Sequence, residues 1–143
     1  MTTSILVVED LEDDYLLLAR AFNRAKIPVD LKWAKNGAEA KEMLLEIVAV
    51  RPSKCLPAFI LSDIKMPHVN GFELLEWIRA QEYLRRLPFI VMTSSSADVD
   101  TAKAYDLGAN GYIVKPITTQ EIEGCARAIE QFWILHNKGP TFW

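Results

Sequence analysis

The chain has 143 residues, of which 50% are hydrophobic and 24% are charged, and its formal net charge is −3. This length suits one domain with a sizeable buried core, and no apolar run approaches the ~20 residues of a membrane span. Basic and acidic residues are interspersed, so we expect no direct DNA binding. The N-terminus lacks the pattern of a signal peptide, which favours a cytoplasmic protein. Cys55 and Cys125 are too few for a disulfide framework or a metal set, and we expect free thiols.

Short apolar runs alternate with longer helical patterns along the chain. Strands are predicted over 4–8, 29–34, 58–62, 89–93 and 111–114. Helices are predicted over 12–26, 38–50, 71–85 and 98–107, and a last helix, capped by Thr118 or Thr119, over the stretch up to about Leu135. Residues 51–57, with two prolines and no apolar period, are predicted to form a loop. We expect a single domain over 1–143, with a core over about 4–135 and an apolar tail over 136–143.

This alternation predicts an α/β fold, a (βα)5 doubly wound parallel sheet with helices on both faces. Right-handed crossovers leave few topologies, and the flavodoxin-like strand order 2-1-3-4-5 is the natural one for five units. In such folds ligands bind beyond the carboxyl ends of the strands, at the switch point between strands 1 and 3. The residues that follow each strand are therefore the candidates for chemistry.

Charged and hydroxyl side chains follow four of the predicted strands. Glu9 and Asp10 follow the first, Asp63 the third, Thr93 ends the fourth, and Lys115 follows the fifth. Carboxylates crowded together repel unless a proton or a cation neutralises them, and Mg²⁺ is the hard cation that oxygen ligands prefer. Lys115 supplies a fixed positive charge and Thr93 a hydroxyl. The set suits phosphoryl transfer onto an aspartate carboxylate.

Other polar residues near these strands have simpler interpretations. Asp13 and Asp14 are interpreted as charges that favour the positive end of the first predicted helix. His68, in a predicted turn, and His136, near the C-terminus, are expected to be solvated.

Four segments carry a family resemblance: ILVVED (5–10), DIKMPHVNG (63–71), MTSSS (92–96) and GANGYIVKP (108–116). Together and in this order they make the chain resemble the response-regulator receiver (CheY-like) family of two-component systems, from about Ser4 to Leu135. The resemblance implies that Asp63 accepts a phosphoryl group from a histidine kinase. It also implies that the protein is a switch and not an enzyme. Such a switch catalyses only its own phosphorylation and dephosphorylation.

The same resemblance implies a magnesium site. Asp10 and Asp63 ligate Mg²⁺ together with the backbone carbonyl of Lys65, and Glu9 matches the acidic position that often acts through a water. The side chains of Lys65 and Ser95 occupy positions that tune the lifetime of the acyl phosphate.

Further positions are assigned to the switch itself. Thr93 follows the phosphoryl oxygen, Lys115 pairs with it, and Tyr112 matches the aromatic residue that turns inward on activation. The peptide between Lys115 and Pro116 matches one that is usually cis in the family. The altered surface of helix 4, strand 5 and helix 5 is then expected to signal to a downstream protein or phosphotransfer partner.

A narrower resemblance is to the stand-alone regulators paired with bacterial and cyanobacterial phytochromes. It rests on the long segment 47–57, the run YDLGANGYIVKP (105–116) and the pair Phe132 and Trp133. It implies a bacteriophytochrome as the kinase and a homodimer through the strand 5 and helix 5 side, with Phe132 and Trp133 as candidate contacts. The alternative for the apolar tail is that it folds back over its own sheet edge.

Three other functions are weighed against this one. A phosphatase of the aspartyl-phosphate type needs a second carboxylate two residues after the nucleophile, where this chain has Lys65. A flavin carrier needs a phosphate-binding loop after the first strand, where the acidic segment 9–14 would repel phosphate. A non-phosphorylated adaptor of the same fold stays open.

Overall fold

The computed structural model describes residues 2–143 and contains a five-stranded parallel sheet in the order β2-β1-β3-β4-β5. The strands are β1 (Thr3–Val8), β2 (Val29–Ala34), β3 (Phe59–Ser62), β4 (Phe89–Thr93) and β5 (Gly111–Val114). The α-helices are α1 (Glu12–Arg24), α2 (Gly37–Ala49), α3 (Gly71–Ala80), α4 (Asp98–Asp106) and α5 (Thr119–Ile129), and a π-helix, η1 (Glu130–His136), follows α5. The predicted fold class and strand order are confirmed.

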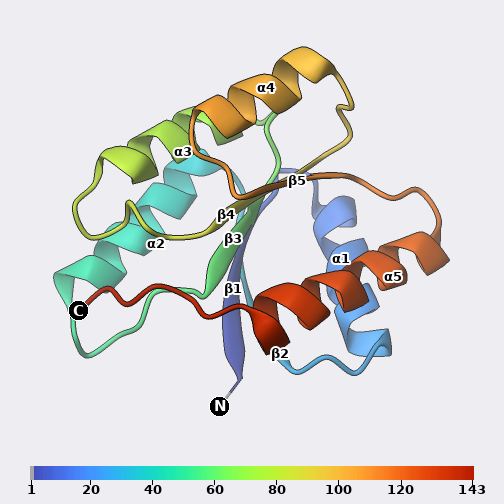
Figure 1. Cartoon of the computed structure of the whole chain (residues 1–143), viewed down its shortest axis with the longest axis horizontal. Helices are drawn as coiled ribbons and strands as arrows, with labels where there is room; N and C mark the ends of the chain where they lie inside the picture. The colour runs from blue at the N-terminus through green and yellow to red at the C-terminus, as the bar shows by residue number, and fades with distance from the viewer. Residues whose placement is uncertain (1) are drawn as a thin grey trace.

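The sheet is covered on both faces, with α2, α3 and α4 on one side and α1 and α5 on the other (Figure 1). Successive side chains of a strand point to opposite faces. Along β1, Ile5 and Val7 therefore join the core under α1 and α5, while Leu6 and Val8 join the core under α2 and α3. This double burial explains why the central strands read as continuous apolar runs.

Three helices begin at a side-chain cap. The side chain of Asn36 accepts a hydrogen bond from the backbone N–H of Glu39 at 2.8 Å, and Thr118 accepts one from Glu121 at 3.1 Å. Asn70 and Glu73 form a reciprocal capping box at the start of α3. Of the two predicted caps of the last helix, Thr118 is the one that is used.

The predicted end of the third helix at residue 85 is wrong. Helix α3 ends at Ala80 because Gln81 is extended, with φ −92° and ψ 130°. The following turn buries Leu84 and Leu87 in the core. The guanidinium of Arg79 donates hydrogen bonds to the carbonyls of Arg85 at 3.0 Å and Leu87 at 2.7 Å. These tertiary contacts compensate for the helical hydrogen bonds that the turn gives up.

The apolar tail folds back over the amino-terminal edge of the sheet, as the alternative interpretation proposed (Figure 1). It leaves η1 and reaches the α2 side of the molecule, where Phe142 packs against the core and the ring of Trp143 lies 6.4 Å from that of Tyr83. Trp133 also packs inward, with its ring centroid 5.9 Å from that of Phe59. Cys55 and Cys125 are free. Among residues 2–143, no helix is long and apolar enough to cross a membrane.

Gly71, the first residue of α3, fixes how closely this helix approaches the end of β3. A Cβ atom at this position would lie 2.1 Å from the backbone oxygen of Asp63. Neither partner can yield without moving backbone, so we expect Gly71→Ala to lower the free energy of unfolding by about 1–3 kcal/mol. Urea denaturation measures the change.

Gly124→Ala is the matched control. A Cβ atom there meets nothing within 4 Å, on an exposed part of α5. Because alanine favours a helix over glycine, this control should gain about 1 kcal/mol. Wild-type stability of Gly71→Ala would show that the contact with Asp63 does not constrain the helix.

Candidate functional site

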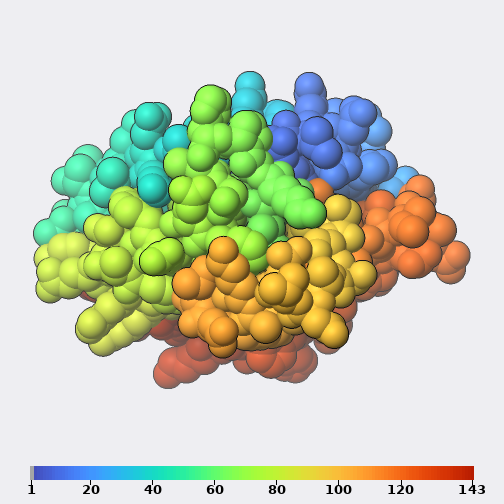
Figure 2. Space-filling view, turned by 90° about the horizontal axis from the view of Figure 1, so that it is seen from above, coloured from blue at the N-terminus to red at the C-terminus, as the bar shows by residue number. Residues whose placement is uncertain are grey.

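The strands of a parallel sheet end at one edge, and the residues singled out from the sequence follow those ends. Figure 2 looks onto this edge, where the segments after β1 in blue, β3 in green, β4 in yellow and β5 in orange all reach the surface. Register places the ends of β1 and β3 side by side, with Val8 opposite Ser62. Asp63 therefore follows β3 directly beside the residues that follow β1.

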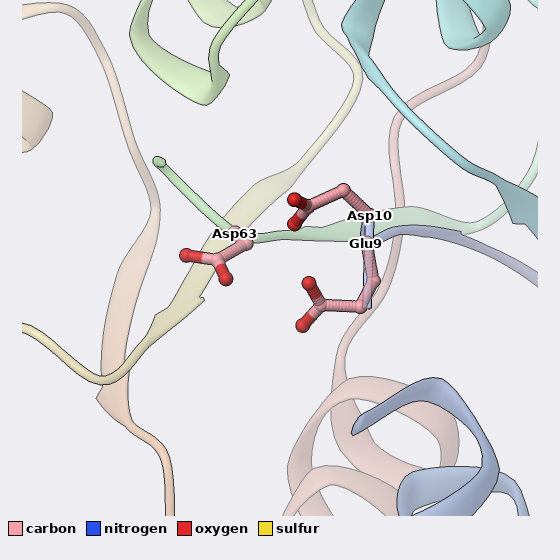
Figure 3. A group of neighbouring side chains, drawn as sticks. All are labelled: Glu9, Asp10 and Asp63. Atoms are coloured by element: carbon pink, nitrogen blue, oxygen red, sulfur yellow. The ribbon is translucent and has the colours of Figure 1, made fainter. Parts of the chain in front are cut away.

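Three carboxylates converge at this edge. Glu9, Asp10 and Asp63 each offer an oxygen, and these oxygens all lie within 4.8 Å of one another (Figure 3). Glu9 is 4% exposed and Asp63 is 8% exposed, so both are taken out of water. The predicted shared pocket is confirmed.

Backbone and side-chain contacts hold Asp63 and Glu9 in place. The backbone N–H of Ile64 donates to Asp63 Oδ1 at 2.6 Å, which fixes the rotation of that carboxylate. On the other side, the indole Nε1 of Trp33 donates to the backbone oxygen of Glu9 at 2.8 Å. The Trp33 ring stacks on Tyr15 with 4.5 Å between centroids. Trp33 could not be identified from the sequence pattern, because its contact comes from the neighbouring strand β2, 24 residues further along the chain.

Lys115 closes the pocket from the β5 side. Its ammonium donates hydrogen bonds to Asp63 Oδ2 at 2.8 Å, to Asp14 Oδ2 at 2.7 Å and to Glu9 Oε1. Burial by itself would lower the pKa of Lys115, but the hydrogen bonds to Asp14, Asp63 and Glu9 outweigh it and raise the pKa above its usual value. Lys115 is therefore a fixed positive charge, as predicted.

The interpretation of Asp14 as only a helix-end charge was incomplete. Asp14 lies in the first turn of α1, where a carboxylate does favour the helix dipole, but its side chain also binds Lys115. Side chains of a helix tilt toward its N-terminus. Because α1 begins two residues after Asp10, that tilt points Asp14 back to the carboxyl edge of the sheet, and the spacing was the signal that could have identified it.

The peptide between Lys115 and Pro116 is not cis, so that prediction is wrong. Within residues 2–143, the only cis peptide bond is the one between Arg51 and Pro52. The trans form is favoured before proline by about 0.5–1 kcal/mol. Since Lys115 already reaches the carboxylates with the trans bond, nothing in this pocket requires the cis form.

Thr93 and Tyr112 are joined through the loop after β4. Thr93 is buried at the end of β4, and the backbone N–H of Ser95 lies 3.4 Å from its Oγ1. The hydroxyl of Tyr112 donates to the backbone oxygen of Ser95 at 2.9 Å, and Ser95 Oγ donates to Asp100 Oδ2 at 2.6 Å. A displacement at Thr93 therefore has a direct route to Tyr112 and to the start of α4.

The remaining candidates lie at the surface. Lys65 is exposed and, with Asn70 and Asp100, borders an open groove beside α4. His68 and His136 are both exposed, which confirms that they are solvated.

The donor set fits a hard divalent cation. Glu9, Asp10, Asp14 and Asp63 contribute four carboxylates against the single ammonium of Lys115, so the cluster keeps an excess of negative charge. All the donors are oxygens, which Mg²⁺ and Ca²⁺ prefer over softer ligands. Glu9, Asp10 and Asp63 are the residues close enough together to share one ion.

Glu9 carries an electrostatic cost in the metal-free protein. Burial raises its pKa to about 7, and the charge of Asp63 adds to this, while Lys115 and the N–H of Leu11 act in the opposite direction. A carboxyl whose pKa is raised on folding binds more protons in the folded state than in the unfolded state. Its contribution therefore makes the metal-free protein less stable as the pH rises from about 4.5 through about 7.

Glu9→Gln should remove this contribution. In EDTA, we expect the free energy of unfolding of the wild type to fall relative to Glu9→Gln between pH 5 and pH 8, with a slope of at most about 1.4 kcal/mol per pH unit. Chemical denaturation at several pH values measures the difference, and Glu42→Gln, on the exposed face of α2, controls for the loss of a carboxylate. Parallel profiles of wild type and Glu9→Gln would contradict the assignment.

Solved structures of similar proteins share this arrangement of elements. The phosphorylated cyanobacterial phytochrome response regulator RcpA superposes with a TM-score of 0.86 at 27% identity, over 99% of this chain and 100% of that one. The response regulator RPA3017 in red light signalling of R. palustris gives 0.85 at 30% identity, over 97% and 99% of the two chains. The Mn²⁺-bound form of response regulator Rcp1 gives 0.83 at 27% identity, over 97% and 99%.

Sequence similarity points to the same group of proteins as these structures. The chain is 32% identical over 136 residues to the probable methanogenesis regulatory protein FilR2 of Methanothrix harundinacea, which covers 95% of this chain and 86% of that protein. Residues 5–127 match the response regulator receiver domain family. With the pocket of Glu9, Asp10, Asp63 and Lys115 at the carboxyl edge of the sheet, the chain belongs to the receiver domains of two-component response regulators.

Proposed function

We propose that the chain is a phosphorylation switch in which Asp63 accepts a phosphoryl group from the phosphohistidine of a sensor histidine kinase. The observation that carries this proposal is the pairing of a fixed, buried aspartate with an ammonium and two further carboxylates in one pocket. An aspartate held in this way can act as the nucleophile that forms an acyl phosphate.

The pocket supplies position and charge, which phosphoryl transfer mainly requires. An oxygen of Asp63 attacks phosphorus, the phosphorus–nitrogen bond to the kinase histidine breaks, and that nitrogen leaves with the electron pair. The N–H of Ile64 orients the carboxylate, and Lys115 neutralises charge on the transferred oxygens. Mg²⁺, held by Asp10, Asp63 and the backbone carbonyl of Lys65, with Glu9 nearby, would supply the remaining neutralisation.

The switch acts through the loop after β4. A phosphoryl group adds close to two negative charges and three acceptor oxygens, which attract the hydroxyl of Thr93. Because Ser95, two residues further on, is bonded to Tyr112 and to Asp100, the loop carries the change to β5 and to the start of α4. The surface of α4, β5 and α5 then changes for a downstream protein or phosphotransfer partner.

The sensor histidine kinase is, in this proposal, a bacteriophytochrome. The support is the similarity over nearly the whole chain to regulators whose names refer to phytochrome or red light signalling. A non-phosphorylated adaptor remains the second candidate, and labelling separates the two.

Asp63→Asn should abolish phosphorylation. We expect the wild type to incorporate ³²P from a labelled small-molecule phosphodonor in the presence of Mg²⁺, and Asp63→Asn to stay at background, because an amide is not a nucleophile for this transfer. Asp98→Asn, on the exposed first turn of α4, is the control and should label like the wild type. A wild type that does not label, although folded, would favour the adaptor.

We also propose that the chain forms a homodimer through the β5 and α5 side. Phe132 is 54% exposed and Leu135 is 58% exposed on η1, and Val114 of β5 is 46% exposed. Trp133 packs mainly against the core of its own chain, so it would contribute less than Phe132 to the dimer interface. Phe132 and Leu135, both on η1, are large exposed apolar groups of the kind found at interfaces.

Phe132→Ser tests the interface. If the proposal holds, sedimentation velocity should show a dimer for the wild type and a dissociation constant at least about tenfold higher for Phe132→Ser, because an aromatic anchor is lost. Leu45→Ser, on α2, replaces a residue that is 49% exposed and should leave the equilibrium unchanged. Sedimentation with and without beryllofluoride and Mg²⁺ shows whether phosphorylation makes or breaks the dimer. A wild type that is monomeric under both conditions would refute the proposed dimer.

A further inference from the structure

The ammonium of Lys115 has no hydrogen-bond donor to spare. An ammonium carries three donors, and here three carboxylates accept from it: Asp14 Oδ2 at 2.7 Å, Asp63 Oδ2 at 2.8 Å and Glu9 Oε1. Glu9 and Asp63 belong to the group of carboxylates that can share a cation. Asp14 is outside that group, and its contact with Lys115 is the only bond that its side chain makes within residues 2–143.

Asp14 approaches Lys115 from helix α1, while Asp63 approaches from β3. The side chain of Asp14 is 33% exposed, whereas those of Glu9 and Asp63 are 6% and 9% exposed. The Asp14 carboxylate can therefore turn toward water. It is a counter-ion of the Lys115 ammonium that can leave without moving the backbone. Glu9 and Asp63, in contrast, are fixed by burial and by backbone hydrogen bonds.

Phosphorylation of Asp63 creates new acceptors that need Lys115. The transferred oxygens carry negative charge and compete with Asp14 for the same ammonium. This competition acts against the transfer.

We propose that Asp14 is a positioning residue that restrains Lys115 and thereby slows the acceptance of a phosphoryl group by Asp63. It touches no reacting atom and acts through the Lys115 ammonium. This inference rests on the proposed phosphorylation of Asp63 and adds a residue that sets its rate.

The test compares Asp14→Asn with Asp13→Asn. The two variants remove the same charge from neighbouring positions of α1, but Asp13 is exposed and makes no contact with Lys115. With a small-molecule phosphodonor and Mg²⁺, we expect Asp14→Asn to be phosphorylated about tenfold faster than the wild type, and Asp13→Asn within about twofold of it. The dissociation constant of beryllofluoride, measured by ¹⁹F NMR, should be about tenfold lower for Asp14→Asn than for the wild type.

A second comparison isolates the route through Lys115. In a Lys115→Ala background, replacing Asp14 should no longer change the phosphorylation rate or the affinity for beryllofluoride. In the metal-free protein, the shift in the urea midpoint caused by Asp14→Asn should be larger with Lys115 present than in Lys115→Ala, because only then is an ion pair lost. Asp14→Ser serves as a second replacement should the asparagine variant fold poorly.

The outcomes separate the two proposals. If the wild type labels on Asp63 but Asp14→Asn is phosphorylated at the rate of Asp13→Asn, or more slowly, the restraint by Asp14 is refuted and the switch stands. If the wild type neither labels nor binds beryllofluoride, the switch itself fails, and the role of Asp14 fails with it.

Discussion

One ammonium holds the functional edge of this molecule together. Lys115 binds carboxylates that come from the end of β1, from α1 and from the end of β3, at sequence separations of 106, 101 and 52 residues. Without that positive charge, the carboxylates would repel one another in a site largely closed to water. The strand order matters because it places the ends of β1 and β3 side by side, and Gly71 matters because it lets α3 close against Asp63.

The same pocket works against the stability of the fold. Glu9 is almost fully buried, and its pKa is raised to about 7 despite its contact with Lys115. A structural role alone would be served better by a smaller or apolar side chain in that position, since desolvating a carboxylate is costly. A buried acid whose ionisation is opposed in this way is typical of a functional site, where a bound cation completes the charge balance.

Much of this arrangement could be predicted from the sequence, because it depends on local patterns. The strands are short apolar runs, and parallel strands end at one edge, so the sequence alone is enough to predict that Glu9, Asp10, Asp63 and Lys115 lie together. The errors concern side-chain reach and tertiary contacts. Helix α3 stops at Ala80, where Arg79 bonds to the following turn and Leu84 and Leu87 are buried. Trp33 reaches the backbone of Glu9 from the neighbouring strand β2. Neither contact produces a periodic pattern of apolar residues from which it could be predicted.

The bond from Trp33 to the backbone oxygen of Glu9 gives this domain a built-in optical probe. The indole is coupled by one hydrogen bond to the peptide that carries an acidic pocket residue, and it is stacked on Tyr15 of the helix that also carries Asp14. We therefore expect the fluorescence of Trp33 to respond to changes in the pocket. A substitution of Trp33 in β2, an edge strand, would likewise remove a hydrogen bond from the backbone of this pocket.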